Sequence, residues 1–74
     1  MPPADELRTA KQFTANAEHL ASRSLDRLAA LRSALDEGDV AKCLLALGGV
    51  TALTEELRNE LDGAAEQLSR LGRS

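Results

Sequence analysis

The sequence predicts an all-α fold, an antiparallel two-helix hairpin with heptad seams. Its composition is that of long helices, because leucine and alanine dominate, tryptophan and tyrosine are absent, and proline occurs only at positions 2 and 3. One internal break, LDEGDV at residues 35–40, divides the chain into two halves. In each half, apolar residues recur at alternating steps of three and four, as in a coiled coil.

The first predicted helix runs from about residue 4 to residue 36. It carries a heptad seam, meaning a line of residues at steps of three and four along one side of the helix. The seam comprises Leu7, Ala10, Thr14, Ala17, Ala21, Ser24, Leu28, Leu31 and Leu35. Its middle consists of small residues, which can accommodate larger side chains of a second helix.

A tight turn is predicted at residues 37–39. Gly38 can adopt the left-handed conformation that ends many helices. Asp39 can then cap the next helix by accepting a hydrogen bond from one of its free backbone amides. Because both residue types stand in the order that a helix stop and a helix start require, the chain is expected to reverse here.

The second predicted helix runs from about residue 40 to residue 71. Its seam comprises Val40, Cys43, Leu47, Val50, Thr54, Leu57, Leu61, Ala64, Leu68 and Leu71. The steps keep their phase across Gly48-Gly49, so the helix is predicted to continue through both glycines, at a cost of roughly 1 kcal/mol each relative to alanine. Folding back at Gly38 sets Leu28 opposite Leu47 and Glu18 level with Arg58.

A wider apolar stripe beside the seams predicts a second contact surface. A two-helix hairpin covers each seam on one side only, and this extra width is typical of a four-helix bundle. We therefore expect two hairpins to pair as a homodimeric four-helix bundle, with Gly49 at a close helix crossing. The expected dimer or partner interface comprises Phe13, Leu20, Leu45, Ala46, Gly49, Ala52 and Leu53. Two alternatives stay open: a docking groove for a different protein, and glycines that serve as a hinge or have no role.

The sequence indicates no catalytic, cofactor-binding or metal site, so an enzyme is not expected. His19 lies nearly opposite the seam, and no second ligand follows it at helical spacing. Cys43 is a seam residue without a basic neighbour on the same face, which favours an inert, buried thiol. Five acidic residues of the second helix form either a solvated face or a docking surface for a basic partner; they are Glu55, Glu56, Glu60, Asp62 and Glu66.

These observations favour a non-enzymatic protein that works by protein–protein contact as a homodimer, in the role of an adaptor, inhibitor or assembly subunit. The net charge of −3 argues against nucleic acid as a partner. The alternative is a small nucleic-acid-binding regulator, since the hairpin and its early Phe13 resemble the architecture of the plasmid RNA-regulating Rop proteins. The basic and amide residues that surround that phenylalanine in Rop proteins are not reproduced.

The chain is expected to be a single domain over residues 1–74, soluble and cytoplasmic. Its first ten residues, MPPADELRTA, lack the basic-then-apolar pattern of a leader. Its apolar runs are shorter than the roughly 18 residues that a membrane-spanning helix needs. Membrane association is therefore not expected.

Overall fold

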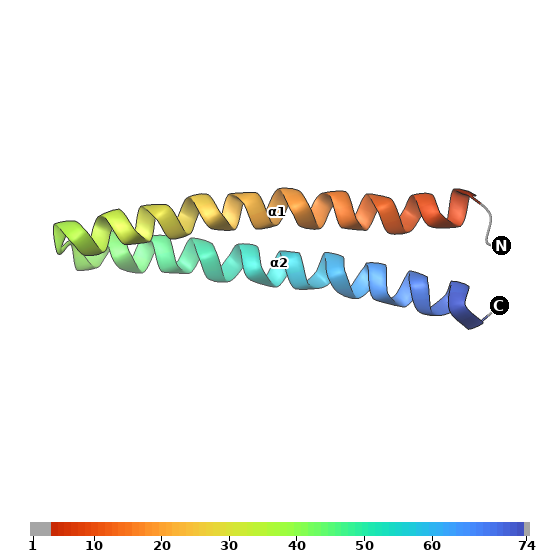
Figure 1. Ribbon diagram of the computed structural model, residues 1–74. Helices are drawn as coiled ribbons and strands as arrows, with labels where there is room; N and C mark the ends of the chain where they lie inside the picture. Colours follow the sequence, from red (N-terminus) through yellow and green to blue (C-terminus); the bar gives the residue numbers. More distant parts are fainter. Residues whose placement is uncertain (1–3, 74) are drawn as a thin grey trace.

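The protein, in a computed structural model that describes residues 4–73, is a hairpin of two long antiparallel helices (Figure 1). Helix α1 spans Ala4–Glu37 and helix α2 spans Val40–Arg73. Both helices begin at the predicted residue, and they end one and two residues later than predicted. Residues 1–3 and 74, which the predicted single domain includes, lie outside the described range.

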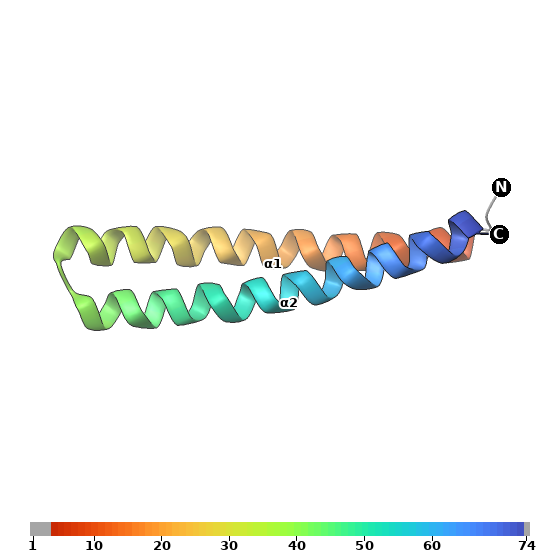
Figure 2. The ribbon, with the colours of Figure 1, turned by 90° about the horizontal axis from the view of Figure 1, so that it is seen from below.

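The molecule is a rod of 55 × 15 × 11 Å. The two helices remain neighbours from the turn to the opposite end, where α1 begins and α2 ends (Figure 1). Seen at right angles, their relative position changes along the rod, so the helices wind about each other (Figure 2). Such winding keeps a heptad stripe in contact with the neighbouring helix over a long distance.

The turn ends α1 as the sequence predicts. Gly38 has a φ of 71°, in the left-handed region. The Gly38 amide donates to the carbonyl of Leu35, and the Asp39 amide donates to the carbonyl of Ala34, each at 3.1 Å. These two bonds form a Schellman motif, which satisfies carbonyl groups that the helix end would otherwise leave unpaired.

Asp39 directly precedes α2, and its predicted capping role is confirmed. Its Oδ1 accepts a hydrogen bond from the Lys42 amide at 3.1 Å, while its carbonyl accepts one from the Cys43 amide at 3.0 Å. The Lys42 Nζ also lies 3.2 Å from Oε2 of Glu37 at the end of α1, bridging the turn. Both helix ends at the turn are therefore fixed by specific polar contacts.

The axial register of the hairpin is close to the predicted one. Three contacts between the helices define it: the Phe13 ring against Gly63, the Asn16 amide against Glu60, and the Arg27 stem against Gly49. In each pair the two residue numbers add to 76. The predicted pair Leu28 and Leu47 adds to 75, so the helices slide by about one residue relative to that prediction.

The predicted seam is only half correct, because both helices are rotated about their own axes. The side chains that the hairpin buries are Ala10, Ala17, Leu20 and Ala34 from α1, with Ala46, Leu53 and Ala64 from α2. Ala10, Ala17 and Ala64 belong to the predicted seam. Six other predicted seam residues remain 44–70% exposed, namely Leu28, Leu35, Val40, Leu47, Leu61 and Leu68.

The rotation has a steric reason. Each apolar stripe is three heptad positions wide, and one neighbouring helix covers only two of them. Five of the seven buried residues are alanines, which let the helix backbones approach closely. The third position, which includes Leu28, Leu35, Leu47 and Leu61, remains exposed.

Candidate interaction face

Eight of the nine large apolar side chains that are exposed in the described chain gather on one side of the hairpin, here named the apolar face. It comprises Leu25, Leu28, Leu35, Val40, Leu44, Leu47, Leu61 and Leu68. Within each helix these residues are separated by three, four or seven residues or by multiples of seven, the spacing that places side chains on one helix face. Their side chains are 44–70% exposed, so the hairpin by itself leaves this face uncovered.

The opposite side of the hairpin shows that both helices contribute to the same apolar face. A shallow groove near the turn is lined by Ala30, Ser33 and Glu37 from α1 and by Lys42 and Leu45 from α2. Each of these groove residues stands two or five residues after a residue of the apolar face. At 3.6 residues per turn, such a step places a side chain on the opposite side of its helix. The apolar faces of α1 and α2 must therefore both lie on the side away from the groove.

Hydroxyl groups around the apolar face are already satisfied. Thr14 and Thr54, which continue the face through the middle of the rod, donate their hydroxyls to the carbonyls of Ala10 and Val50, each at 2.8 Å. Thr51 donates to the carbonyl of Leu47 at 3.0 Å. A buried hydroxyl without a partner is costly. Because these three have partners in their own helix, the face can be covered without that cost.

The outer edges of the apolar face carry a sparse set of charges. The middle rows of the face are the heptad rows that contain Leu28 on α1 and Leu47 on α2. Each edge residue stands three residues before a residue of one of these rows. On α1 the edge residues are Lys11, Glu18, Leu25 and Arg32; on α2 they are Leu44, Thr51, Arg58 and Ala65. All eight are exposed. The rim therefore offers both signs of charge at fixed heights along the rod.

The exposed area of the chain is large for its mass. A compact monomer of 7.9 kDa is expected to expose about 4,400 Å², whereas this chain exposes 5598 Å². The difference of about 1,200 Å² is comparable to the area that a specific protein interface removes from water. One broad side of the rod, 55 × 15 Å, offers roughly the 800 Å² that each partner contributes to such an interface.

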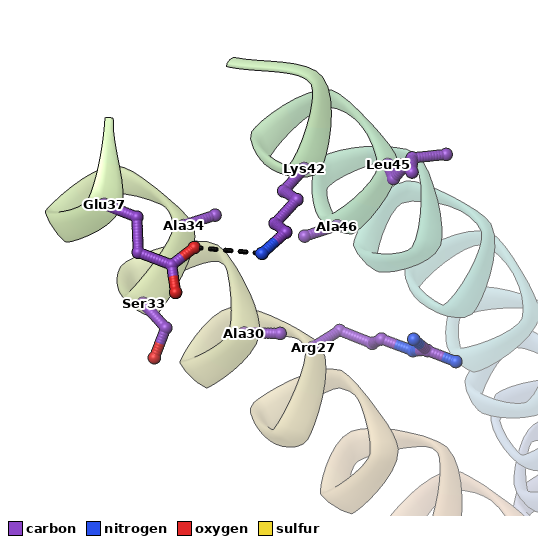
Figure 3. A pocket seen from close by; sticks show the side chains of 8 residues that line it. All are labelled: Arg27, Ala30, Ser33, Ala34, Glu37, Lys42, Leu45 and Ala46. Carbon is purple, nitrogen blue, oxygen red and sulfur yellow. Dashed lines mark hydrogen bonds and ion pairs between the residues drawn. The ribbon is translucent and has the colours of Figure 1, made fainter. Parts of the chain in front are cut away.

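The groove near the turn is lined by charged as well as small side chains (Figure 3). Arg27 extends from α1 toward α2, and its Cδ lies 3.5 Å from the place that a side chain at Gly49 would occupy. The ion pair between Lys42 and Glu37 lies at the turn end of the groove (Figure 3). Leu45, 79% exposed, stands beside this groove and is the large apolar side chain that the apolar face does not include.

The residues of the predicted partner interface lie in different environments in the hairpin. Leu20, Ala46 and Leu53 are buried between the chain's own two helices, so they are not presented to a partner in this hairpin. Phe13 and Gly49 are half-buried on the groove side of the same contact. Leu45 and Ala52 are exposed there. The exposed apolar face contains six residues that the prediction had placed in the seams inside the hairpin, together with Leu25 and Leu44.

The closest approach of a side chain to a helix glycine is at Gly63, which the sequence reasoning did not single out. A Cβ atom at Gly63 would lie 2.7 Å from Cε1 and 2.8 Å from Cζ of the Phe13 ring. The ring therefore occupies space that exists because residue 63 has no side chain. Gly49 and Gly63 lie two heptads apart on one side of α2, and that spacing was the signal that could have revealed both.

The structure does not gather the five acidic residues of α2 into one site. Glu60 is half-buried and accepts a hydrogen bond from Nδ2 of Asn16 at 3.3 Å, while Glu66 pairs with Arg70 at 2.7 Å. The remaining three are exposed: Glu55, Glu56 and Asp62. Within the described part of the chain, no group of three acidic, histidine or cysteine side chains could hold a metal ion.

His19 and Cys43 lie apart from each other. His19 is exposed on α1, whereas Cys43 is half-buried near the start of α2 with a free thiol. The prediction of a buried thiol is therefore met only in part. In the described chain, neither residue belongs to a group of three or more acidic, histidine or cysteine side chains that could hold a metal ion.

Comparison with known proteins returned no family model, no curated protein and no solved structure that matches this chain. Neither described helix combines the length and the apolar character that crossing a bilayer demands.

Proposed function

We propose that this protein is non-enzymatic and works by protein–protein contact, as an assembly subunit, adaptor or inhibitor, and that it does so as a homodimer. The observation that carries the proposal is the apolar face, with eight large side chains exposed on one side of a hairpin. An apolar surface of this extent on a small chain is typical of an interaction site.

A second copy fits this face in length and in character. Two hairpins stacked through their apolar faces would form a four-helix bundle, in which each helix touches two neighbours. The interior of such a bundle would contain the leucines that the single hairpin leaves in water. Chains of this size usually need oligomerisation, a metal or a disulfide to reach useful stability, and the single cysteine cannot form an internal disulfide.

Substitutions on the two sides of the hairpin test the proposal. The double variant Leu47→Lys/Leu61→Lys places two charges on the apolar face. Leu45→Lys places one on the groove side, and Lys42→Leu adds an apolar residue there. Sedimentation at about ten micromolar should give twice the monomer mass for the wild type and both groove-side variants. The double variant should be monomeric or unfolded, because a charge buried in the bundle interior is strongly unfavourable.

The result that would contradict the proposal is a wild-type protein that sediments as a folded monomer at that concentration. A double variant that remains a stable dimer would also contradict it, because the dimer would then use another surface. Far-ultraviolet circular dichroism on the same samples separates loss of pairing from loss of helix.

Nucleic-acid binding remains the second candidate, and one observation favours it. Four basic residues lie on or beside the groove side, which a dimer formed through the apolar face would leave open: Arg23, Arg27, Lys42 and Arg70. Two of them are paired with acids, Lys42 with Glu37 and Arg70 with Glu66. A salt-dependent gel shift with RNA or duplex DNA at physiological ionic strength would support this candidate; the leading proposal predicts no shift.

A further inference from the structure

We infer that the two copies align with their turns at the same end, so that α1 of each hairpin lies beside α2 of its partner. The inference rests on the proposed homodimer and adds its geometry. Two hairpins that meet through one common face can be related by a two-fold axis along the rod or by one across it. The first keeps the turns together, and the second places them at opposite ends.

An axis along the rod leaves every residue at its own height. The partner's α2 then stands beside α1 in the register that the hairpin itself has, in which the numbers of residues at one height add to 76. Glu18 and Arg58 satisfy this relation. Both are exposed edge residues of the apolar face, so Glu18 would meet the partner's Arg58 where the two hairpins join, and the symmetry would repeat this ion pair.

The other edge residues also match without conflict in this arrangement. Leu25 stands level with the partner's Thr51, and Arg32 stands level with the partner's Leu44, along which its aliphatic stem can pack. Lys11 is level with the partner's Ala65. Inside the joint, Leu28 lies within one residue of the height of the partner's Leu47. The rim therefore contains no like-charge contact.

An axis across the rod gives a poorer match. If it passes through the middle of the rod, α1 lies antiparallel to the partner's α1, and Lys11 stands close to the height of the partner's Arg32. The symmetry repeats this like-charge contact. Glu18 would then face the partner's Leu25, and Leu28 would approach the partner's Thr14. Since like charges oppose pairing, charge complementarity favours the turns at one end.

Spin labels at the two ends of α2 measure the arrangement directly. In a Cys43→Ser background, Ala41→Cys places a label near the turn, and Ser69→Cys places one near the far end; both positions are exposed. With the turns together, two Ala41→Cys labels should lie about 25 Å apart, across a bundle with helices roughly 10 Å from each other. With the turns apart, they should lie more than about 40 Å apart, given the 1.5 Å rise per residue.

A mixed dimer provides the reciprocal control. One copy carries Ala41→Cys and the other carries Ser69→Cys. The inferred alignment predicts a long distance of about 40 Å in this mixed pair, while the opposite alignment predicts a short one. A short distance in the mixed pair together with a long one in the Ala41→Cys pair would overturn the inference.

Charge reversal supplies a second, independent readout. Glu18→Arg and Arg58→Glu should each raise the dimer dissociation constant by about three- to tenfold, since two exposed ion pairs are lost in each case. Combined in one chain, the two substitutions restore opposite charges and should restore the dissociation constant. Failure of the combined variant to recover would count against the inferred contact.

The outcomes also separate this inference from the proposed function. A wild-type protein that sediments as a monomer contradicts both. A dimer with the long Ala41→Cys distance contradicts only the alignment and leaves the proposed homodimer in place. A dimer with the short distance and with recovery by charge exchange supports both.

Discussion

The glycines inside α2 differ in what surrounds them. Gly48 has no atom of another segment within 4 Å of the place that a Cβ would take, whereas Gly63 lies against the Phe13 ring. Gly48→Ala should therefore raise the free energy of unfolding by about 1 kcal/mol, the difference in helix propensity. Gly63→Ala should give a free energy of unfolding about 1 kcal/mol lower than Gly48→Ala does, or lower than that of the wild type, because the ring must move. Denaturant unfolding at one fixed protein concentration measures both values.

The Phe13→Ala background provides the control for this comparison. Without the ring, Gly63→Ala should recover the full gain from helix propensity and behave like Gly48→Ala. Gly49→Ala should also be favourable, because its nearest contact is the Arg27 stem at an ordinary 3.5 Å. Equal gains at residues 48 and 63 in the wild-type background would show that the ring does not depend on the missing side chain.

Gly38 is constrained by its backbone and not by crowding. Its φ is 71°, and nothing lies within 4 Å of a Cβ placed there. Gly38→Val should lower the free energy of unfolding by about 1 kcal/mol or more, since β-branched residues resist positive φ. Gly38→Asn should cost clearly less, because asparagine tolerates this region. Equal melting temperatures for the two variants would mean that conformation at residue 38 does not limit the turn.

At the scale of the helix, the Asp39 cap determines where α2 begins. Asp39→Ala removes the acceptor of the Lys42 amide and should lower the free energy of unfolding by about 1 kcal/mol. Asp36→Ala is the matched control, because Asp36 lies in the last turn of α1, where a negative charge is unfavourable. That substitution should be neutral or slightly stabilising in the same denaturant titration. A neutral Asp39→Ala would show that the cap is dispensable.

Helix bounds, turn chemistry and axial register could be predicted because each follows from local sequence. Between two periodic segments, Gly38 is expected to end the first helix and Asp39 to cap the second. A turn this tight then leaves the two helices little freedom to slide along each other. The rotation of each helix is not local. Steps of three and four describe any two adjacent rows of a three-row stripe equally well, so the periodicity alone did not decide whether Leu28 or Leu20 faces α2.

The exposure of Leu28, Leu35, Leu47 and Leu61 was not predicted for the same reason. Side-chain size did not decide between the rows either, because the buried row of α1 contains Leu20 as well as Ala34, and the row with Leu28 also contains Ala21. The continuous steps of three and four therefore predicted Leu28 and Leu47 inside the hairpin. The Phe13 contact with Gly63 was missed because it depends on the rotation as well as on the register.

At the scale of the whole molecule, the apolar face predicts a dimer that is thicker than the hairpin but hardly longer. The hairpin has a Cα radius of gyration of 16.7 Å and a length of 55 Å. For two stacked copies about 10 Å apart, the squared radius of gyration is that of one hairpin plus the square of half the separation. The result is a radius of gyration of about 17 Å. Joining them end to end along the same axis would give about 32 Å, from half of the 55 Å length added in the same way.

Small-angle X-ray scattering on the dimer distinguishes these shapes without any label. The expected result is twice the monomer mass from the forward scattering, with a maximum dimension that stays near the length of a single hairpin. Solvent and side chains raise the measured radius somewhat above the Cα value, but by an amount far below the gap between the two arrangements. A doubled mass with a radius near 32 Å would place the contact at the rod ends. The eight exposed side chains of the apolar face would then still be in water.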